Sequence, residues 1–311
     1  MAKHVFFIDA LEKLKVKKDS SLFMAHAVQA KGDEALALFE EDFYYLNEGM
    51  ISWKAYPLRT EVDGFDLKSV ELLAPIMLPL EHISWFHMRL DPPFDGRYLR
   101  YLWMLEALKE RGLQIVNDPA GILLFNEKLT AYSMAPSHPT FVGASFEAFE
   151  RFIQGEVVMK PLDLYQGMGV EKISLDHLSY EEKRQFFEQK RQDMGGVVVA
   201  QPFIGDVIKG EVRSIFFDGE HLGSILKTPK KGDFLANLAQ GATYVATTLG
   251  SELQAQCEKL CGQMAKNGIR FVAFDLLAGK ISEANVTCPG LLVEVSKANH
   301  KNLAEEILKK L

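Results

Sequence analysis

The sequence predicts an N-terminal α/β domain followed by an α+β region, and three observations support this prediction. In the first third, short apolar runs alternate with amphipathic helical patterns, which is typical of a mostly parallel sheet covered by helices. From about residue 117 onward, hairpin patterns are mixed with helices instead. The length of 311 residues suits two domains, or one domain with subdomains.

The elements of the N-terminal part follow from apolar runs and capping residues. Asp19 offers an N-cap to a helix over residues 20–31, and Asp95 caps a strongly amphipathic helix that Gly112 ends. Tyrosines, a turn and an apolar run over residues 44–58 predict a β-hairpin inserted into the α/β pattern. Buried strands are expected over residues 4–9, 35–39, 82–88 and 114–116.

A boundary is expected near residues 117–128, where Asp118-Pro119 breaks the pattern and a short helix follows. Beyond it, two strands flank a glycine loop, and two strand pairs turn at Asp218-Gly219 and Ala278-Gly279. The strands are expected over residues 157–160, 170–174, 197–203, 211–217, 221–227, 270–277 and 280–286. The helices are expected over residues 176–193, 250–267 and 300–311.

Composition and charge exclude several classes of protein. Hydrophobic residues make up 48% of the chain, which excludes disorder of the whole chain. The net charge of −7 argues against a nucleic-acid binder, although a local basic pocket for phosphates stays open. No window approaches a transmembrane helix, and the N-terminus has no signal-peptide core, so no membrane partner is expected.

The chain has three cysteines, Cys257, Cys261 and Cys288. An odd and sparse count fits a reducing compartment better than a disulfide scaffold, and we expect a cytoplasmic location. A metal site formed by the three thiols is the less common alternative to buried structural cysteines.

The first candidate site for chemistry is a phosphate-binding loop. Lys128 and Lys160 supply cations, and Gly167 and Gly169 allow backbone N–H groups to approach phosphate oxygens. The spacing is not that of a P-loop. The alternative is a pair of solvated lysines beside an ordinary turn.

The second candidate site is a metal site formed by Asp275, Glu283 and Asn285. Asp275 lies in an apolar strand, and Glu283 and Asn285 share one face of the returning strand. Three oxygen ligands on adjacent strands suit Mg²⁺ that bridges substrate phosphates. The alternative is an acidic turn, but carboxylates within apolar strands are costly without partners.

Three further segments carry charge where strands begin or end. Glu211 and Arg213 share a face of one strand, where Arg213 could neutralise developing negative charge; the alternative is a surface ion pair. Lys17-Lys18-Asp19-Ser20-Ser21 follows the first strand, and Arg89 follows the third. Ligands bind at such strand ends in α/β sheets, although helix capping by Asp19 explains part of the pattern.

Read together, these segments resemble the bacterial-type glutathione synthetases, which are ATP-grasp ligases. The resemblance runs nearly from end to end, and its most specific stretches are Asp91-Pro92-Pro93-Phe94-Asp95 and Glu283-Ala284-Asn285-Val286-Thr287. It also includes Lys18-Asp19-Ser20-Ser21, Asn126-Glu127-Lys128, Lys160-Pro161-Leu162-Asp163, Asn237-Leu238-Ala239 and Phe274-Asp275.

The resemblance implies a fold and an activity. An N-terminal α/β pre-ATP-grasp domain over residues 1–122 would bind substrate, and a two-subdomain ATP-grasp fold would follow over residues 123–204, with the glycine-loop lid, and 205–311, with the metal site. The implied reaction passes the γ-phosphate of ATP to the C-terminal carboxylate of γ-glutamylcysteine. Glycine then attacks the acyl phosphate, and glutathione, ADP and phosphate are released. A homo-oligomer is also implied.

The resemblance also assigns roles to individual residues. Arg213 and Asn237 would act at the transferring phosphate, and Glu211 would meet the ribose. ATP would bind with one or two Mg²⁺ ions, or with Mn²⁺ in their place. The implied residues are Lys128, Lys160, Gly167, Gly169, Gln201, Phe203, Ile204 and Glu211 for nucleotide, Asp19, Ser20, Ser21 and Arg89 for substrate, and Asp275, Glu283 and Asn285 for metal.

The sequence departs from the family pattern at three places. Leu164-Tyr165-Gln166 is inserted before the glycine loop, Leu235 stands where the family has arginine, and Val293 replaces an arginine before Glu294. These departures leave two alternatives open: an ATP-grasp ligase for a different acid or amine, and a non-catalytic nucleotide-binding protein.

Overall fold

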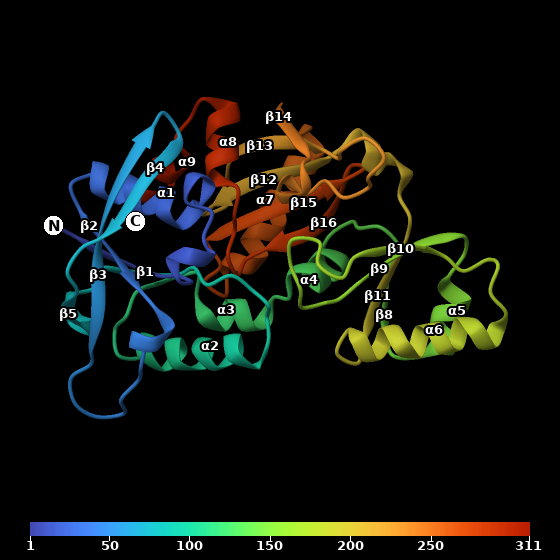
Figure 1. The fold of residues 1–311 in the computed structure, drawn as a ribbon, viewed down its shortest axis with the longest axis horizontal. Helices are drawn as coiled ribbons and strands as arrows, with labels where there is room; N and C mark the ends of the chain where they lie inside the picture. Colours follow the sequence, from blue (N-terminus) through green and yellow to red (C-terminus); the bar gives the residue numbers. More distant parts are fainter.

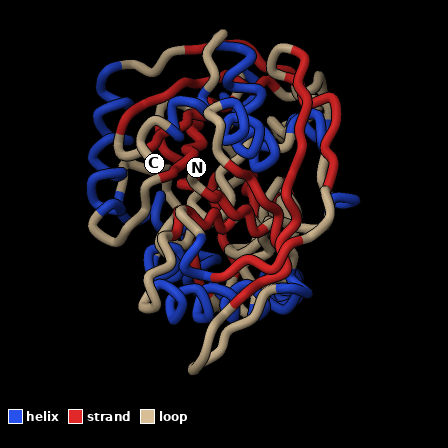
Figure 2. Tube along the Cα trace, turned by 90° about the vertical axis from the view of Figure 1, so that its left-hand side faces the viewer, coloured by secondary structure: helices blue, strands red, loops and turns tan.

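The computed structural model describes residues 1–311 and contains three β-sheets with helices packed on and between them (Figure 1). The four-stranded sheet and its helices form one end of the molecule, and the other two sheets lie together at the opposite end (Figure 1). The two termini lie close to each other in both backbone views (Figures 1 and 2).

The N-terminal sheet has seven strands in the order β4-β3-β2-β1-β6-β7, with β5 paired to β3. Its strands β2, β1, β6 and β7 are parallel, as the sequence predicts, whereas β3, β4 and β5 add antiparallel pairs. The strands are β1 (Lys3–Phe7), β2 (Glu34–Leu38), β3 (Ser52–Asp63), β4 (Asp66–Leu72), β5 (Ile76–Pro79), β6 (Trp85–Met88) and β7 (Ile115–Val116). The helices are α1 (Ser20–Ala30), α2 (Gly96–Lys109) and α3 (Pro119–Leu124).

The second sheet is small and antiparallel, in the order β10-β9-β11-β8. Helix α6 begins with a capping box, in which Ser179 and Glu182 satisfy each other's backbone N–H groups. The strands are β8 (Phe141–Gly143), β9 (Glu156–Lys160), β10 (Glu171–Ser174) and β11 (Val198–Pro202). The helices that precede the sheet or pack on it are α4 (Glu127–Met134), α5 (Phe146–Phe152) and α6 (Tyr180–Asp193).

The third sheet is antiparallel, in the order β14-β13-β12-β15-β16. Its register pairs Glu211 with Lys227, Arg213 with Asp275, and Asp275 with Glu283. The strands are β12 (Glu211–Phe217), β13 (Glu220–Thr228), β14 (Thr243–Thr247), β15 (Phe271–Leu277) and β16 (Lys280–Asn285). The helices are α7 (Ser251–Ala265), α8 (Leu292–Asn299) and α9 (Leu303–Leu308).

The hydrophobic cores join the first and third sheets. Successive side chains of β1 point to opposite faces of its sheet, so Phe7 enters a core of 34 buried residues and Phe6 enters one of 27. Both cores also contain residues of the third sheet, such as Phe274 and Phe217. The second sheet has a separate core of nine buried residues. The first and third sheets therefore form one packed body, against which the second sheet stands apart.

One predicted element is wrong, and another is shorter than predicted. Residues 44–46 form no strand, and the hairpin is instead made by β3 and β4, which turn at Gly64. Residues 300–311 hold only the short helix α9, and α8 precedes it, separated by His300 in the left-handed conformation. Helix α5 and the strands β5, β8 and β14 are not among the elements expected from the sequence.

Helix α4 packs on β16 of the third sheet.

The division of the chain at residues 122 and 204 stays a prediction. No helix of the structure combines the length and the apolar character needed to cross a membrane.

Candidate active site

A cavity of about 490 Å³ opens where the three sheets meet. Its lining contains fifteen of the residues that the sequence analysis singled out, and they come from all three parts of the chain. They are Asp19, Ser20, Ser21, Arg89, Lys160, Gly167, Gln201, Phe203, Ile204, Glu211, Arg213, Asn237, Asp275, Glu283 and Asn285. Of the predicted residues, Lys128 and Gly169 do not line this cavity.

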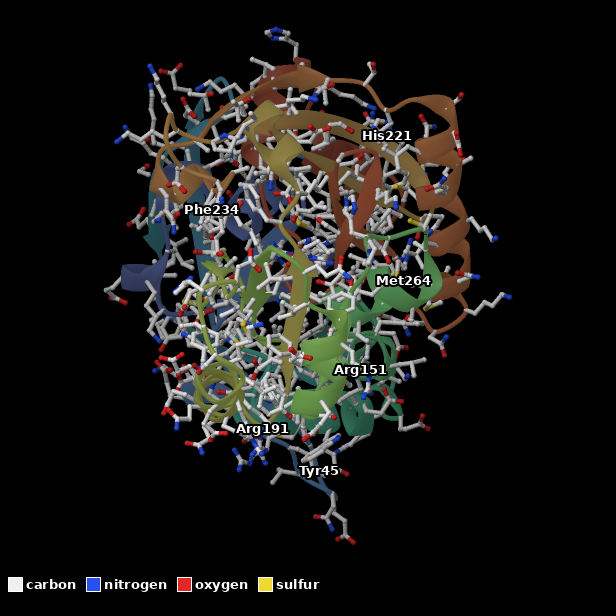
Figure 3. The ribbon with its side chains drawn as sticks, turned by 90° about the vertical axis from the view of Figure 1, so that its right-hand side faces the viewer. Tyr45, Arg151, Arg191, His221, Phe234 and Met264 are labelled. Atoms are coloured by element: carbon white, nitrogen blue, oxygen red, sulfur yellow. The ribbon has the colours of Figure 1, made fainter.

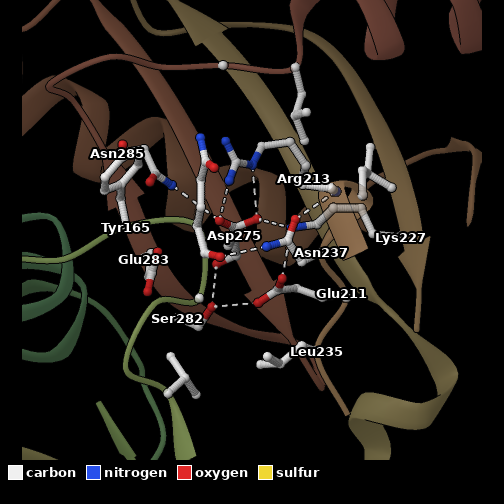
Figure 4. Close-up of a pocket in the computed structure, with 18 of the residues that line it drawn as sticks. Tyr165, Glu211, Arg213, Lys227, Leu235, Asn237, Asp275, Ser282, Glu283 and Asn285 are labelled. Carbon is white, nitrogen blue, oxygen red and sulfur yellow. Dashed lines mark hydrogen bonds and ion pairs between the residues drawn. The ribbon is translucent and has the colours of Figure 1, made fainter. Parts of the chain in front are cut away.

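Asp275 is the centre of the buried polar cluster (Figure 4). Arg213 holds it with two hydrogen bonds, from Nε to Oδ1 at 2.9 Å and from Nη2 to Oδ2 at 2.6 Å. Lys227 Nζ lies 2.7 Å from Oδ1, and Asn285 Nδ2 lies 3.2 Å from Oδ2. Burial raises the pKa of Asp275, but Arg213 and Lys227 outweigh burial and hold it well below its usual value. Asp275 is therefore ionised at neutral pH.

Glu211 extends this cluster along β12. Lys227 Nζ donates to Glu211 Oε2 at 2.8 Å, and Ser282 Oγ lies 3.3 Å from Oε1. Burial raises the pKa of Glu211, and Lys227 opposes that rise. The two carboxylates Glu211 and Asp275 thus share one buried lysine.

Two lysines, Lys160 and Lys128, lie near Glu283 of β16. Lys160 ends β9, is buried in the cavity wall, and has its ammonium 5.3 Å from the ring centre of Tyr132. Burial lowers the pKa of Lys160, and the nearby charge of Lys128 lowers it further. Lys128 Nζ donates to the carbonyl of Leu164 at 2.6 Å and lies 3.9 Å from Glu283. The inserted segment that contains Leu164 therefore holds Lys128 back from the cavity.

The glycine loop is fastened to the loop that follows β13. Asn237 Nδ2 donates to the carbonyl of Gln166 at 2.6 Å, and both residues line the cavity. Gln166, Gly167 and Gly169 all have positive φ, which glycine adopts without the steric cost that a side chain would add. Gly167 lies against Leu235 and Asn237, whereas Gly169 packs on Pro161, outside the cavity lining.

The residues predicted to bind the nucleotide at Gln201, Phe203 and Ile204 lie at the end of β11 and directly after it. Gln201, Phe203 and Ile204 line the cavity, and Phe203 N donates to the carbonyl of Glu156 at 2.8 Å. The ammonium of Lys172 lies 3.8 Å from the ring centre of Phe203. These contacts fix the segment as one wall of the cavity.

The residues predicted to bind substrate form the wall on the side of the N-terminal sheet. Asp19 caps α1 by accepting from Leu22 N at 2.8 Å, and Ser20 Oγ accepts from Leu292 N at 3.1 Å. Arg89 donates to Ser21 Oγ at 3.0 Å and to the carbonyl of Pro289 at 2.9 Å, and its Nη1 is buried without a partner. Arg89 thus carries an unused donor beside the cavity.

The predicted metal ligands fit a divalent cation by donor type. Asp275, Glu283 and Asn285 are brought together on β15 and β16, with Asp275 opposite Glu283 in the register. No three His, Cys, Asp or Glu side chains gather as a metal site, so the amide oxygen of Asn285 is needed as the third donor. Since Mg²⁺ keeps several waters and binds substrate phosphates, one or two carboxylates suffice.

Lys227 is the residue that the sequence analysis missed. It is 5% exposed and joins Glu211 to Asp275. The signal was present in the hairpin over residues 211–227, because a tight turn at Asp218-Gly219 places Lys227 opposite Glu211.

Comparison with known families agrees with this geometry. The profile described as "Prokaryotic glutathione synthetase, N-terminal domain" matches residues 2–122. The profile described as "Prokaryotic glutathione synthetase, ATP-grasp domain" matches residues 127–300.

Curated relatives match over nearly the whole chain. A glutathione synthetase of Parasynechococcus marenigrum (strain WH8102) is 30% identical over 314 residues, covering 99% of this chain and 98% of its own. One of Prochlorococcus marinus (strain MIT 9313) is 31% identical over 313 residues, with the same coverage of 99% and 98%. One of Shewanella oneidensis is 30% identical over 305 residues, covering 96% and 94%.

Solved structures share the fold. D-cycloserine synthetase DcsG superposes with a TM-score of 0.68 at 16% identity, and 99% of each chain is covered. Macrocyclase MdnC, bound with its precursor peptide, superposes with a TM-score of 0.62 at 16% identity, again covering 99% of each chain.

These comparisons confirm the resemblance and the α/β and ATP-grasp fold that the sequence predicts. A family of this kind uses ATP with a divalent metal. The chain belongs to the prokaryotic glutathione synthetase family and is an ATP-dependent ligase of glutathione synthesis.

Proposed function

We propose that this enzyme joins γ-glutamylcysteine and glycine through an acyl phosphate, with release of ADP and phosphate. The observation that supports the proposal most directly is the single cavity in which Lys160, Arg213 and the acidic pair Asp275 and Glu283 face the substrate wall of Arg89. A cavity lined on one side by phosphate-binding groups and on the other by an unused arginine donor suits two anionic substrates.

The first step is the transfer of the γ-phosphate to the cysteinyl carboxylate. Charge spreads over the phosphoryl oxygens during such a transfer, so fixed cations lower the barrier. Arg213 and Lys160 lie in the cavity wall to provide them. Arg213 is fixed by its two bonds to Asp275, and it needs little reorganisation when charge develops.

The second step is the attack of glycine's amine on the acyl carbon, with departure of inorganic phosphate. Water competes with the amine, because an acyl phosphate hydrolyses readily. We assign the exclusion of water to the loop of Gly167 and to Asn237, which holds that loop by the carbonyl of Gln166. Asn237 lies where it could also donate to the transferring phosphate.

The remaining assignments concern the nucleotide and the metal. Gln201, Phe203 and Ile204 would contact the adenine, Glu211 the ribose, and Lys128 the phosphates once it is released from Leu164. Asp275, Glu283 and Asn285 would hold one or two Mg²⁺ ions, or Mn²⁺, which would neutralise charge on the phosphates.

The test is ADP release by the purified protein with Mg-ATP, γ-glutamylcysteine and glycine, each omitted in turn, with glutathione identified by chromatography. We expect release only when all components are present, and none after chelation of the metal. Thermal stabilisation by Mg-ATP without turnover of these substrates would contradict the proposal.

Asp275→Asn tests the metal assignment in the same assay. The substitution removes the charge of a predicted ligand and leaves Arg213 and Lys227 with a neutral partner. We expect turnover to fall by about 10²-fold or more. Asp176→Asn, on an exposed loop, is the matched control. Unchanged turnover of Asp275→Asn would remove Asp275 from the metal site.

A second candidate function is ligation of a different acid or amine. Leu235 lines the cavity where the family has arginine, so one cation is missing from the wall. Val293, by contrast, is buried in the core and does not line the cavity. Leu235→Arg separates the candidates, because it should improve turnover of γ-glutamylcysteine and glycine only if these are poor substrates of the native chain.

We also propose a homo-oligomer. Several large apolar side chains between residues 44 and 77 are exposed, and Tyr45 projects at one tip of the molecule (Figure 3). They belong to the loop before β3 and to the edge strand β5. Light scattering on the purified protein measures the oligomeric state directly. A monomer at micromolar concentration would refute the proposal of a homo-oligomer.

A further inference from the structure

A buried carboxylate with no assigned role lies at one end of the cavity. Glu294, in the first turn of α8, is 5% exposed and lines the cavity. Its Oε2 is buried and has no hydrogen-bond partner. Most buried polar groups in proteins are paired, because an unpaired carboxylate is costly to bury. The unpaired oxygen therefore points to a donor that the free chain does not contain.

The surroundings of Glu294 place it on the N-terminal side of the cavity. Helix α8 packs against α1 and against the turn Val16–Lys18. Lys15 and Lys18, at the two ends of that turn, also line the cavity. Burial raises the pKa of Glu294, and the positive charge of Lys18 opposes that rise. This part of the cavity thus contains a buried carboxylate with one unpartnered oxygen close to the charge of Lys18.

This arrangement is complementary to the head group of an α-amino acid, which carries an ammonium and a carboxylate on one carbon. Charge-assisted hydrogen bonds to such groups are the strong ones. The groups that act on phosphate, Arg213 and Asp275, cluster on the third sheet, so an acid substrate must place its reacting carboxylate there. Its other end is then free to reach the wall of Lys18 and Glu294.

We infer that Glu294 binds the α-ammonium of the glutamyl end of the acid substrate, with Lys15 and Lys18 facing its α-carboxylate. The inference rests on the proposed function, which supplies γ-glutamylcysteine as that substrate. Glycine also carries an ammonium group. Its nitrogen must lose its charge and attack beside the phosphate, however, so we place it at Arg213 and Asn237.

The test compares γ-glutamylcysteine with N-glutarylcysteine, which keeps both carboxylates and the thiol but lacks the α-ammonium. Affinity for each acid is measured by calorimetry with Mg²⁺ and a non-hydrolysable ATP analogue, and KM is measured for both acids and for glycine. We expect Glu294→Gln to weaken binding of γ-glutamylcysteine about ten- to a hundredfold. Its affinity for N-glutarylcysteine and its KM for glycine should stay unchanged.

One control variant and three contrary outcomes make the test decisive. Glu12→Gln changes an exposed glutamate that does not line the cavity, and it should alter neither acid's affinity. Equal weakening of both acids by Glu294→Gln would show a merely structural role, and a raised KM for glycine alone would assign Glu294 to the acceptor; either result overturns the inference. Failure of the native enzyme to form glutathione would refute the proposed function first, and the inference with it.

Discussion

Single residues in this site act through shared partners. Lys227 is bonded to both Glu211 and Asp275, so it lowers the repulsion between two carboxylates that burial would otherwise make costly. Removal of one member of such a cluster leaves the others unpaired. The shared contacts therefore restrict the side chains of the cluster to one conformation more strongly than an isolated ion pair would.

Lys227→Met tests this at the residue scale. Methionine fills much of the same space but leaves Glu211 without its cation, so we expect a loss of roughly 2–4 kcal/mol in the free energy of unfolding. Turnover should fall as well, because Arg213 alone would then hold Asp275. Urea unfolding and the ADP assay measure the two effects. Lys266→Met, at an exposed position after α7, should change the stability by less than about 0.5 kcal/mol.

Two buried histidines make the stability depend on pH. His4 Nδ1 lies 3.1 Å from His87 Nε2, and His87 Nδ1 is buried without a partner. Burial lowers the pKa of His4 to about 4 and that of His87 well below its usual value. The unfolded chain therefore binds protons at a pH where the folded chain does not. The free energy of unfolding is therefore unaffected by this pair above about pH 6.5, and it falls as the pH decreases toward 4.

We expect His4 alone to lower the unfolding free energy by roughly 2–3 kcal/mol between pH 7 and pH 4.5, and His87 to add to this fall. His87→Phe should flatten that dependence, since it removes one buried group that must be kept neutral. His82→Gln, at an exposed position, should not. Urea unfolding at several pH values measures this dependence. If the unfolding free energy changed equally with pH in the native chain and in His87→Phe, the histidine pair would not be its cause.

At the scale of elements, helix α3 meets the loop that links α7 to β15. A Cβ on Gly121 would collide with the backbone carbonyl of Asn267 and with the side chain of Ile269. Backbone cannot yield as a flexible side chain does, so glycine is required by close approach rather than by its dihedral angles. This contact ties the N-terminal part of the chain to the third sheet.

Gly121→Ala should destabilise the protein by roughly 1–3 kcal/mol through this collision. Gly262→Ala is the matched control, because Gly262 lies within α7 and a Cβ there meets nothing within 4 Å. It should instead stabilise by about 0.5–1 kcal/mol, since alanine favours a helix interior. Thermal unfolding measures both effects. If the two variants shifted the unfolding midpoint in the same direction, close approach would not be the reason for glycine at position 121.

At the scale of the whole molecule, the core is divided unequally. The first and third sheets share two large cores, whereas the second sheet depends on nine buried residues. A unit with a small core of its own opens at lower free energy than the body it adjoins. The second sheet also carries the loop of Gln166 and Gly167, which lines the cavity. We therefore expect the least stable unit to be the one that moves to admit substrate.

Hydrogen exchange measures this division. Amides of β9 and β11 should exchange faster than those of β12 and β15 in the free protein. Mg²⁺ with a non-hydrolysable ATP analogue should slow exchange in β9 and β11 most, because the nucleotide would join them to the third sheet. Uniform protection across the three sheets, with and without nucleotide, would show one rigid unit instead.

The sequence by itself determined the period and the ends of most elements, because apolar spacing, capping residues such as Asp19 and Asp95, and tight turns act locally. It also determined which side chains lie opposite each other within each hairpin of the third sheet, since the turn sets the register of the two strands. The pairing of β12 with β15, which brings Arg213 to Asp275, was left to the tertiary structure. The hairpin predicted over residues 44–58 was wrong because aromatic residues favour a strand only where a partner strand is available.

Only the tertiary structure decided which candidates face one cavity. Lys128 and Lys160 look alike in the sequence, yet Lys160 lines the cavity and Lys128 is held by Leu164. The hairpin places Lys227 opposite Glu211, but its second partner, Asp275, lies on β15 and is brought to it only by packing. Glu294 carries no local signal, because the free chain holds no partner for its Oε2. The reason is physical. The local sequence pattern sets which helix or strand forms and which face of it is apolar. The free-energy cost of burying a charged side chain depends instead on neighbours that only long-range packing supplies.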